Sequence, residues 1–419
     1  MAVNAASDSI AVSPSSTSLS GLDGINFFLA GMQAGFGPFV AVLLTDEKWT
    51  QQNIGYVLSV GGLAGLLSQL PGGELLDLSS SKRFLVAIGA IVVAVSALLM
   101  ALWPILPIVV ATSVLQGLTG GVLGPAVAAI SLGLVGHRAL AKRLGRNQRF
   151  ASAGALTITG LMGIISYFSS YRAIFIVSAT LVLPLLLAIT RIRSADIHFG
   201  RSCGYPNHHA STTPPRARRL RLLRNYNLLT FSGCLFLFQF ANASMLPLAG
   251  EQLAYRNGTG ASFIISALII LPQIVVVLSA PRVGQLAQSW GRQPLLLTGF
   301  SALALRALLF AVTTNSHLLI CIQLLDGVSG SVLGVLTALI IADLTNGTGR
   351  FNLAQGLVGM FAGIGASLST TFFGLIVGTF GSAIGFLSIA GVALTAVLLA
   401  WLLMPETKPS KEIRSLRTR

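Results

Sequence analysis

Long apolar stretches separated by short polar breaks run along the whole chain. Most of these stretches hold about 20 residues, and a helix of that length, rising about 1.5 Å per residue, crosses a hydrocarbon layer of ~30 Å. The pattern therefore predicts an all-α integral membrane protein. The expected transmembrane helices, numbered one to twelve, cover residues 22–44, 53–76, 83–102, 105–135, 151–169, 171–190, 227–250, 261–281, 293–314, 316–343, 352–379 and 381–404.

The twelve expected helices form two repeats of six, because short phrases recur between the halves of the chain. "QGLTGGVLG", which starts at Gln116, returns as "DGVSGSVLG" at Asp326, and "LSQLPGGELLD" returns as "LSAPRVGQLAQ" at nearly the same offset. Pro38 with Pro247, and "GRNQRFASAG" with "GRFNLAQG", repeat in a similar register. Repeats with an even number of helices share one orientation and enclose a cavity at their interface, where a transported substrate would sit.

Basic residues collect in a few polar segments and set the expected orientation. They are dense in His137–Arg149 and in the run of arginines that follows residue 215. Lys and Arg mark cytoplasmic segments, so both termini are expected in the cytoplasm and the protein in the cell membrane. The expected organisation is a disordered cytoplasmic tail (1–20), a six-helix bundle (21–190), a basic cytoplasmic linker (191–226), a second six-helix bundle (227–405) and a basic cytoplasmic tail (406–419).

The composition excludes several other classes of protein. Only 9% of the residues are charged, whereas a soluble domain carries about 25%. The net charge of +15 is explained by topology, so lipid is an expected partner and nucleic acid is not. Three scattered cysteines offer neither a disulfide framework nor zinc-ligand spacing, and no phosphate-binding loop occurs. No metal and no cofactor are expected.

The segment after the second helix carries a family resemblance. It reads Gly73-Glu74-Leu75-Leu76-Asp77-Leu78-Ser79-Ser80-Ser81-Lys82-Arg83, and its counterpart in the second half runs from Gly284 to Gln293. The first copy keeps the glycine, the acid and the final basic residues, and the second keeps Gly291 and Arg292 but lacks the acid. Over residues 20–405 the chain resembles the major facilitator superfamily, nearest in look to its drug and metabolite efflux branches. The resemblance implies a secondary transporter, and a monomer is expected.

This loop is expected to act as a latch between the halves. By the family pattern, the carboxylate of Asp77 faces the positive end of the eleventh helix, which starts beside Arg350. Close helix packing at the glycines would support the latch. The alternative is that these loops only anchor helices among lipid headgroups. The candidate gating residues are Gly73, Asp77, Lys82, Arg83, Gly284, Gly291, Arg292, Asp343 and Arg350.

Two ionisable residues are expected at membrane depth, where charge is costly and indicates function. Asp326 lies about ten residues into the tenth helix and Arg306 at a comparable depth in the ninth. The two side chains are predicted to form an ion pair. Asp326 is either a protonation switch or a fixed partner of Arg306, and the sequence leaves both interpretations open. At the matching position of the first half, Gln116 is neutral.

Polar side chains in the first and seventh helices are predicted to line the cavity. Asp23, Asn26, Gln33 and neighbouring small residues recur at spacings of three and four in the first helix, which places them on one face. Gln239 and Asn242 are three apart in the seventh. Phenylalanines of these two helices, including Phe27, Phe28, Phe36, Phe39, Phe231, Phe236, Phe238 and Phe240, suggest a greasy cavity with a few polar handles.

The predicted function is secondary active transport of a small amphipathic organic compound by alternating access, as proton-coupled efflux. Gln116-Gly117 matches the end of the R-x-x-Q-G motif of proton-coupled exporters, but Ser113 replaces its arginine. Uptake or exchange of a small organic acid is therefore an alternative. A non-transporting sensor or lipid-handling protein on the same scaffold is a third hypothesis. No catalytic constellation is recognised, so an enzyme is not expected.

Overall fold

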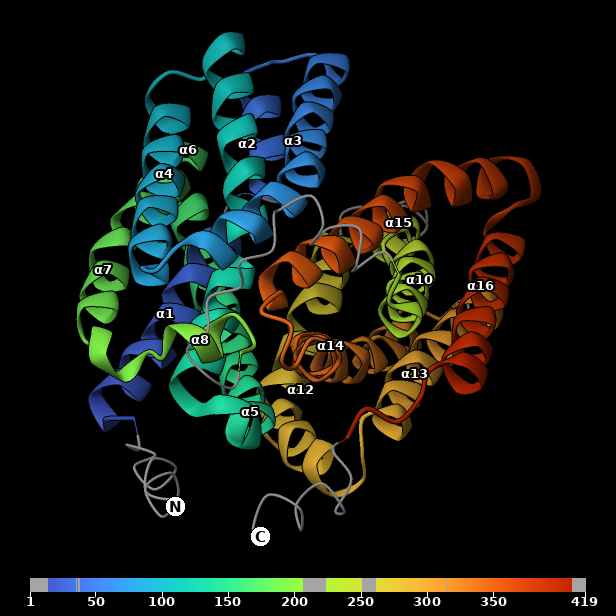
Figure 1. Cartoon of the computed structure of the whole chain (residues 1–419). Helices are drawn as coiled ribbons and strands as arrows, with labels where there is room; N and C mark the ends of the chain where they lie inside the picture. The colour runs from blue at the N-terminus through green and yellow to red at the C-terminus, as the bar shows by residue number, and fades with distance from the viewer. Residues whose placement is uncertain are drawn as a thin grey trace, which may run out of the picture.

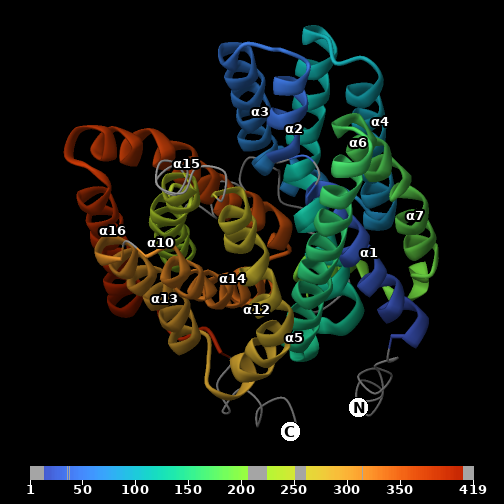
Figure 2. The same ribbon diagram turned by 180° about the vertical axis from the view of Figure 1, so that it is seen from behind.

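The computed structural model describes residues 14–34, 36, 38–205, 224–250, 261–313 and 315–408, which form helices joined by short connections (Figure 1). Helices α1 to α7 form one group and α10 to α16 the other, and the linker between them contains η1 and α8 (Figures 1 and 2). The elements are α1 (Ser16–Ala34), α2 (Pro38–Asp46), α3 (Gln51–Leu78), α4 (Lys82–Leu102), α5 (Leu106–Phe168), α6 (Tyr171–Thr180), α7 (Val182–Thr190), η1 (Ser194–Asp196), α8 (Phe199–Ser202), α10 (Tyr226–Asn242), α12 (Ala261–Ser289), α13 (Gln293–Val312), α14 (Ser316–Leu344), α15 (Phe351–Phe380) and α16 (Ser382–Leu403).

The helices account for the predicted membrane crossings. Eleven helical segments of the described chain are long and apolar enough to span a membrane. One of them, Leu106–Ile165, contains a bend at Gly136, where φ is 65° and ψ is 175°. A positive φ is accessible to glycine without the steric cost that a side chain would bring. Divided at Gly136, α5 supplies two crossings, so the predicted all-α fold with two sets of six helices is confirmed.

The fifth transmembrane helix starts earlier than the sequence predicts. Residues 137–150, expected as a loop because of their basic cluster, continue α5 as helix. Two of these arginines bind the first helix: Arg143 Nη2 lies 2.5 Å from Asp23 Oδ1, and Arg146 Nη2 lies 2.7 Å from Asp23 Oδ2. Part of the cluster's charge therefore holds α5 against α1.

The start of α1 is fastened to the linker. The hydroxyls of Ser15 and Ser18 donate hydrogen bonds to the Asp196 carboxylate at 2.6 and 2.7 Å, and α1 begins at Ser16. Residues 16–20, expected in the disordered tail, are therefore helical, whereas residues 1–13 lie outside the described chain. These hydrogen bonds favour the ionised carboxyl and hold the pKa of Asp196 below its usual value.

Replacing Asp196 by Ala is expected to release the first turn of α1. Because its pKa is lowered in the folded protein, the carboxylate stabilises the fold above the ordinary Asp value of about 3.9, and this contribution is lost as the pH falls through the folded pKa. Amide hydrogen exchange at pH 7 should be faster over residues 16–20 in Asp196→Ala than in the native protein. Asp46→Ala, at an exposed position at the end of α2, is the control and should leave this exchange unchanged. Equal exchange rates in Asp196→Ala and the native protein would contradict the role of the contact.

The two halves meet on the side of the molecule where α1 begins and the segment after α16 ends, called the terminal side below (Figures 1 and 2). There Gly73 of α3 lies against the backbone of Asn352 at the start of α15, and Gly145 of α5 lies against α12. A Cβ added at Gly145 would come within 2.6 Å of the Ala280 carbonyl oxygen. Glycine therefore allows the backbones of the two halves to approach closely.

Away from the terminal side the halves diverge. The contact between α3 and α15 extends from Gly73 to Leu66, whose side chain faces Gly363. Farther along, Gly62 of α3 and Gly374 of α15 have no neighbour from another described element within 4 Å of an added Cβ. Both views show α15 turning away from α3 (Figures 1 and 2). The described halves are thus closed together on the terminal side and separated on the opposite side.

Candidate functional site

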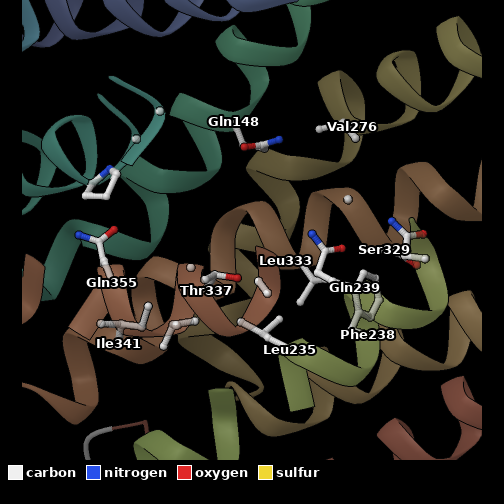
Figure 3. A pocket seen from close by; sticks show the side chains of 18 of the residues that line it. Gln148, Leu235, Phe238, Gln239, Val276, Ser329, Leu333, Thr337, Ile341 and Gln355 are labelled. Atoms are coloured by element: carbon white, nitrogen blue, oxygen red, sulfur yellow. The ribbon is translucent and has the colours of Figure 1, made fainter. Parts of the chain in front are cut away.

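A cavity of about 510 Å³ lies between the two halves (Figure 3). This volume falls in the range of sites that bind small organic molecules. Helices α3 and α5 line it from one half, and α10, α12, α14 and α15 line it from the other. Both copies of the repeated phrase contribute, the first through Gly120 and Gly124 and the second through Asp326, Ser329 and Gly330. The repeat thus brings equivalent segments to opposite walls of the cavity.

Asp326 and Arg306 form the predicted ion pair at this cavity. Arg306 is 2% exposed and lies behind the wall, whereas Asp326 is 32% exposed and lines the cavity. The Arg306 guanidinium also donates a hydrogen bond to Asn242 Oδ1 and approaches the Met245 sulfur at 3.1 Å. The pair therefore joins α13 to α14 and places one carboxylate within reach of a solute.

The predicted polar face of the first helix is divided by the fold. Asp23 is bound by Arg143 and Arg146 and lines neither of the two cavities described here. Asn26 lines the second cavity and donates a hydrogen bond to the Leu22 carbonyl oxygen at 2.7 Å. Gln33 is exposed and lies outside both. Of these three residues only Asn26 thus lines one of the two cavities, and Asp23 does not because arginines from an unexpected stretch of α5 hold it.

Gln116 and Asp326 occupy matching places in the repeat but different surroundings. The Gln116 side-chain nitrogen is buried, and the described chain offers it no hydrogen-bond partner. Gln116 does not line either cavity, so its predicted place at the substrate is not supported. The glycine that follows each of these residues lets its helix pack closely on a neighbouring helix. A Cβ on Gly327 would lie 2.6 Å from the Pro272 carbonyl oxygen, and Gly117 packs equally closely against α3.

Amide side chains dominate the polar surface of the cavity. Gln239 and Asn242 are there as predicted, and several glutamines outside the predicted set join them (Figure 3). Gln148 was hidden in the expected loop, and Gln69 was visible only as part of a repeated phrase. The amides lining the cavity are Gln69, Gln148, Gln239, Asn242, Gln273 and Gln355.

Aromatic rings contribute little to this surface. Of the phenylalanines expected to make the cavity greasy, Phe238 alone is among its described lining residues. Phe240 instead packs against Phe372 and Phe373 of α15, with ring centroids 5.3 and 5.1 Å apart. The rings therefore serve helix packing, as aromatic pairs commonly do. The cavity is therefore less aromatic than predicted, and aliphatic side chains such as Leu235, Val276 and Leu333 supply most of its apolar surface.

A second cavity of about 350 Å³ continues from the first. The two share Gln148, Thr337 and Gln355. The second one extends to Asn26 and Asn147, and Asn147 Oδ1 accepts a 2.7 Å hydrogen bond from Arg143 Nε. A series of polar side chains thus leads from the main cavity toward the Asp23 ion pairs. Within the described residues, no group of three His, Cys, Asp or Glu side chains could hold a metal ion.

Asp77 docks on the start of α15, as the family resemblance implies. Its carboxylate accepts hydrogen bonds from the Leu353 backbone nitrogen at 3.0 Å and from Asn352 Nδ2 at 2.8 Å. The first backbone nitrogens of a helix lack partners within the helix and carry partial positive charge. Arg350, at the N-cap position of α15, makes no side-chain capping bond. A carboxylate from one half therefore caps a helix of the other half.

The basic residues of the same loop have other partners. Lys82 Nζ donates to the Ser79 carbonyl oxygen at 3.4 Å and to Cys203 Sγ at 3.5 Å. Arg83 donates to the Ser194 hydroxyl at 2.7 Å. Both therefore fasten the linker to the first half.

The linker runs beneath this latch and contacts both halves. In the first half, Cys203 Sγ lies 3.6 Å from the Asp77 carbonyl oxygen. In the second half, the backbone carbonyls of Ser202 and Cys203 accept hydrogen bonds from the Asn352 side chain and the Phe351 nitrogen. Gly347 donates likewise to the Gly204 carbonyl at 2.7 Å. Burial raises the pKa of the Cys203 thiol above its usual range.

The matching loop of the second half closes on its own half. Arg292 Nε binds Asp343 at 2.8 Å, and its backbone nitrogen donates to Glu406 at 2.8 Å. Gly291 has a φ of 114°, which favours glycine. Gly284 packs against Gly145 of the other half. Among these residues, Gly284 contacts the first half, whereas the acid–base pair does not, and Glu406 was missed because it lies in the expected tail.

Comparisons with known proteins agree with this architecture. The model of the Major Facilitator Superfamily matches residues 22–321 and 231–419. Two uncharacterized MFS-type transporters of Mycobacterium tuberculosis, MT2531 of strain CDC 1551 / Oshkosh and Rv2456c of strain H37Rv, are each 38% identical over 393 residues, which cover 93% of this chain and 93% of theirs. The multidrug resistance protein fnx1 of Schizosaccharomyces pombe is 28% identical over 38% of this chain and 29% of its own. The solved structure of the proton:xylose symporter XylE bound to 6-bromo-6-deoxy-D-glucose has a similar fold, with a TM-score of 0.69 and 15% identity over 96% of this chain and 98% of that one.

Proposed function

This chain belongs to the major facilitator superfamily, and we propose that it is a proton-coupled secondary transporter that exports a small organic solute by alternating access. As a member of this family it is a multi-pass membrane transporter and not an enzyme. The proposed orientation puts the terminal side in the cytoplasm, as the positive-inside rule favours. The proposed unit is the monomer, because the cavity is built from the two halves of one chain.

The observation that carries this proposal is the cavity between two repeats that are closed on one side and separated on the other. Asp77 and the packed glycines hold the terminal side together, and in the proposed orientation this closed side makes the state outward-facing. Rocking of the repeats about the cavity would expose it to the opposite side. Transport then requires that the latch at Asp77 open in each cycle.

Asp326 is the proposed site of proton coupling. Its carboxylate is partly exposed to the cavity, whereas its partner Arg306 is buried. Protonation of Asp326 would remove the charge that holds Arg306, and Arg306 would keep the Asn242 oxygen and the Met245 sulfur as neighbours. The pair can therefore open without leaving the guanidinium in an entirely apolar site, which is what a reversible switch needs.

The proposed direction of transport is export. Export is favoured by the similarity to the multidrug resistance protein fnx1 over part of the chain. Uptake or exchange of an organic acid is the second candidate. It would need an accessible cation, and Arg306 is buried and engaged by Asp326. A non-transporting sensor on this scaffold is the candidate of another class, and the transport assay below tests it.

Transport in proteoliposomes tests the proposed function. With an imposed proton gradient, the native protein is expected to move at least one solute from a panel of efflux-pump dyes, small organic acids and neutral hydroxyl-rich compounds. Asp326→Asn should abolish gradient-driven accumulation, because the amide cannot bind and release a proton, while gradient-independent exchange persists. Asp46→Asn, which alters an exposed carboxylate at the end of α2, is the matched control. Unchanged accumulation in Asp326→Asn would refute coupling through this residue, and no flux of any solute would favour a sensor.

A further inference from the structure

The cavity between the halves is lined by amides contributed by five different helices. They are Gln69 of α3, Gln148 of α5, Gln239 and Asn242 of α10, Gln273 of α12 and Gln355 of α15. Each amide offers two N–H donors and one oxygen acceptor. Ser329 and Thr337 of α14 add hydroxyls that can also donate and accept. Hydrogen-bonding groups of both kinds therefore surround the cavity.

Charge is nearly absent from the same surface. Asp326 is the one charged residue among the described lining, and Arg306 balances it from behind the wall. An anionic solute would find no cation in this lining. A cationic solute would have to displace Arg306 from Asp326, which would leave a buried guanidinium without its counter-ion.

We infer that the transported solute is an uncharged molecule with several hydroxyl or amide groups. This inference rests on the proposed function, because it assigns the substrate class of the same cavity. Amides match hydroxyls well, since each hydroxyl both donates and accepts a hydrogen bond. A purely apolar solute would displace water from the amides without replacing its hydrogen bonds, which disfavours binding. The scarcity of aromatic lining points in the same direction.

Two of the amide side chains pack against glycines of the opposite half. Gln148 of α5 packs on Gly334 of α14, where an added Cβ would lie 2.5 Å from the Gln148 Cδ. Gln69 of α3 packs on Gly359 of α15, where an added Cβ would lie 2.6 Å from its side-chain oxygen. Each glutamine thus crosses the interface to a place that only glycine leaves open. Binding groups of the two halves are held in a defined arrangement before the solute arrives, which reduces the cost of ordering them.

Gln148 and Gln355 stand where the two cavities join. A solute that passes from the main cavity toward the cytoplasm meets these two side chains, one from each half. They are therefore assigned as determinants of specificity along the path. A site built to hydrogen-bond a hydroxyl discriminates strongly against analogues that lack it.

Counterflow in proteoliposomes tests the inference without depending on proton coupling, because exchange needs no imposed gradient. The labelled solutes are glucose, mannitol and uridine as neutral hydroxyl-rich probes, ethidium as an organic cation and benzoate as an organic anion. Saturable counterflow is expected for at least one neutral probe and for neither ion. Counterflow of ethidium or benzoate alone would overturn the inferred class and leave the proposed transport function standing. Counterflow of no probe would count against both.

Substitutions in the cavity give the second test. Gln148→Leu and Gln355→Leu are expected to raise the KM of the neutral solute tenfold or more, with a smaller change in the maximal rate. Gly334→Ala should raise KM as well, because the new Cβ displaces Gln148 without removing a polar group. Gln52→Leu, on the exposed first turn of α3, is the matched control, and the thermal midpoint of each purified variant monitors folding. Unchanged KM in folded Gln148→Leu and Gln355→Leu would contradict the assignment.

Discussion

Asp326→Ala is expected to lower the thermal stability of the purified protein strongly, because it leaves the Arg306 guanidinium, 2% exposed, without its carboxylate. Removal of one partner of a buried ion pair costs about 3–5 kcal/mol, chiefly from the uncompensated charge that remains. The partial exposure of Asp326, 32%, and the second acceptor on Asn242 place the expected loss at the lower end, at ~3 kcal/mol. The loss should appear as a lower thermal midpoint in detergent.

A double variant separates the charge penalty from lost packing. Arg306→Met with Asp326→Leu removes both charges and keeps apolar volume, and such replacements are commonly neutral or stabilising. The double variant should therefore recover most of the stability that Asp326→Ala loses, although it should not couple to protons. The exposed pair of Arg172 with Glu47, with side chains 47% and 24% exposed, is the matched control, since surface pairs contribute about 0–1 kcal/mol. Equal destabilisation by Glu47→Ala and Asp326→Ala would contradict this account.

Asp77→Ala is expected to open the terminal side of the protein. The carboxylate accepts three hydrogen bonds from the first turn of α15, and a hydrogen bond to a charged group contributes about 1.5–3 kcal/mol. Loss of even one such contribution shifts the ratio of closed to open molecules by roughly 10-fold to 100-fold. The change acts on the closed state alone, because Asn352 and Leu353 move away from Asp77 when the halves separate.

The buried thiol of Cys203 reports this opening. It is 2% exposed and lies beside Asp77, and its raised pKa keeps it protonated and slow to react at neutral pH. With Cys234 and Cys321 replaced by Ser, maleimide labelling at pH 7 should be at least 10-fold faster in Asp77→Ala than in the native protein. Because the pKa of Cys203 is raised, its labelling in the native protein should keep accelerating as the pH increases past the ordinary thiol pKa of about 8.5.

Asp343→Ala is the control for this experiment. The Asp343 side chain is buried, but it binds Arg292 of its own half and, within the described residues, forms no hydrogen bond with the latch. Its loss should lower stability without exposing Cys203. If Asp77→Ala left the labelling rate of Cys203 unchanged, the carboxylate would not be the latch.

The sequence alone predicts the features that depend on length, repetition and charge at depth. Twelve crossings follow from apolar runs, the two halves follow from the phrases at Gln116 and Asp326, and the ion pair follows from the cost of a lone charge in the membrane. The docking of Asp77 on α15 required the family pattern, because no local property of residue 77 indicates which helix it caps.

The features that the sequence hides depend on which helix faces are brought together. Asp23 has the spacing of a cavity residue, but Arg143 and Arg146 reach it because α5 continues as helix through a cluster that resembles a loop. Gln148 lies in the same cluster, so its place on a helix that lines the cavity is not evident from the sequence. The phenylalanines were expected at the cavity, but most of them pack elsewhere. An aromatic ring on a helix can pack against another helix or against a solute, and its neighbours in space decide which.

The contact between the linker and the start of α15 is expected to affect how fast the two halves come back together. Ser202, Cys203 and Gly204 present backbone carbonyls to α15 and the turn before it, while Lys82 and Arg83 keep the linker on the first half. When the halves separate, this segment stays covalently tethered near its partners. Its return is thus an intramolecular binding event at an effective concentration set by the tether, about millimolar for a short flexible one. The length of the linker, and not only the strength of the contacts, is then expected to govern how fast the terminal side closes after each turnover.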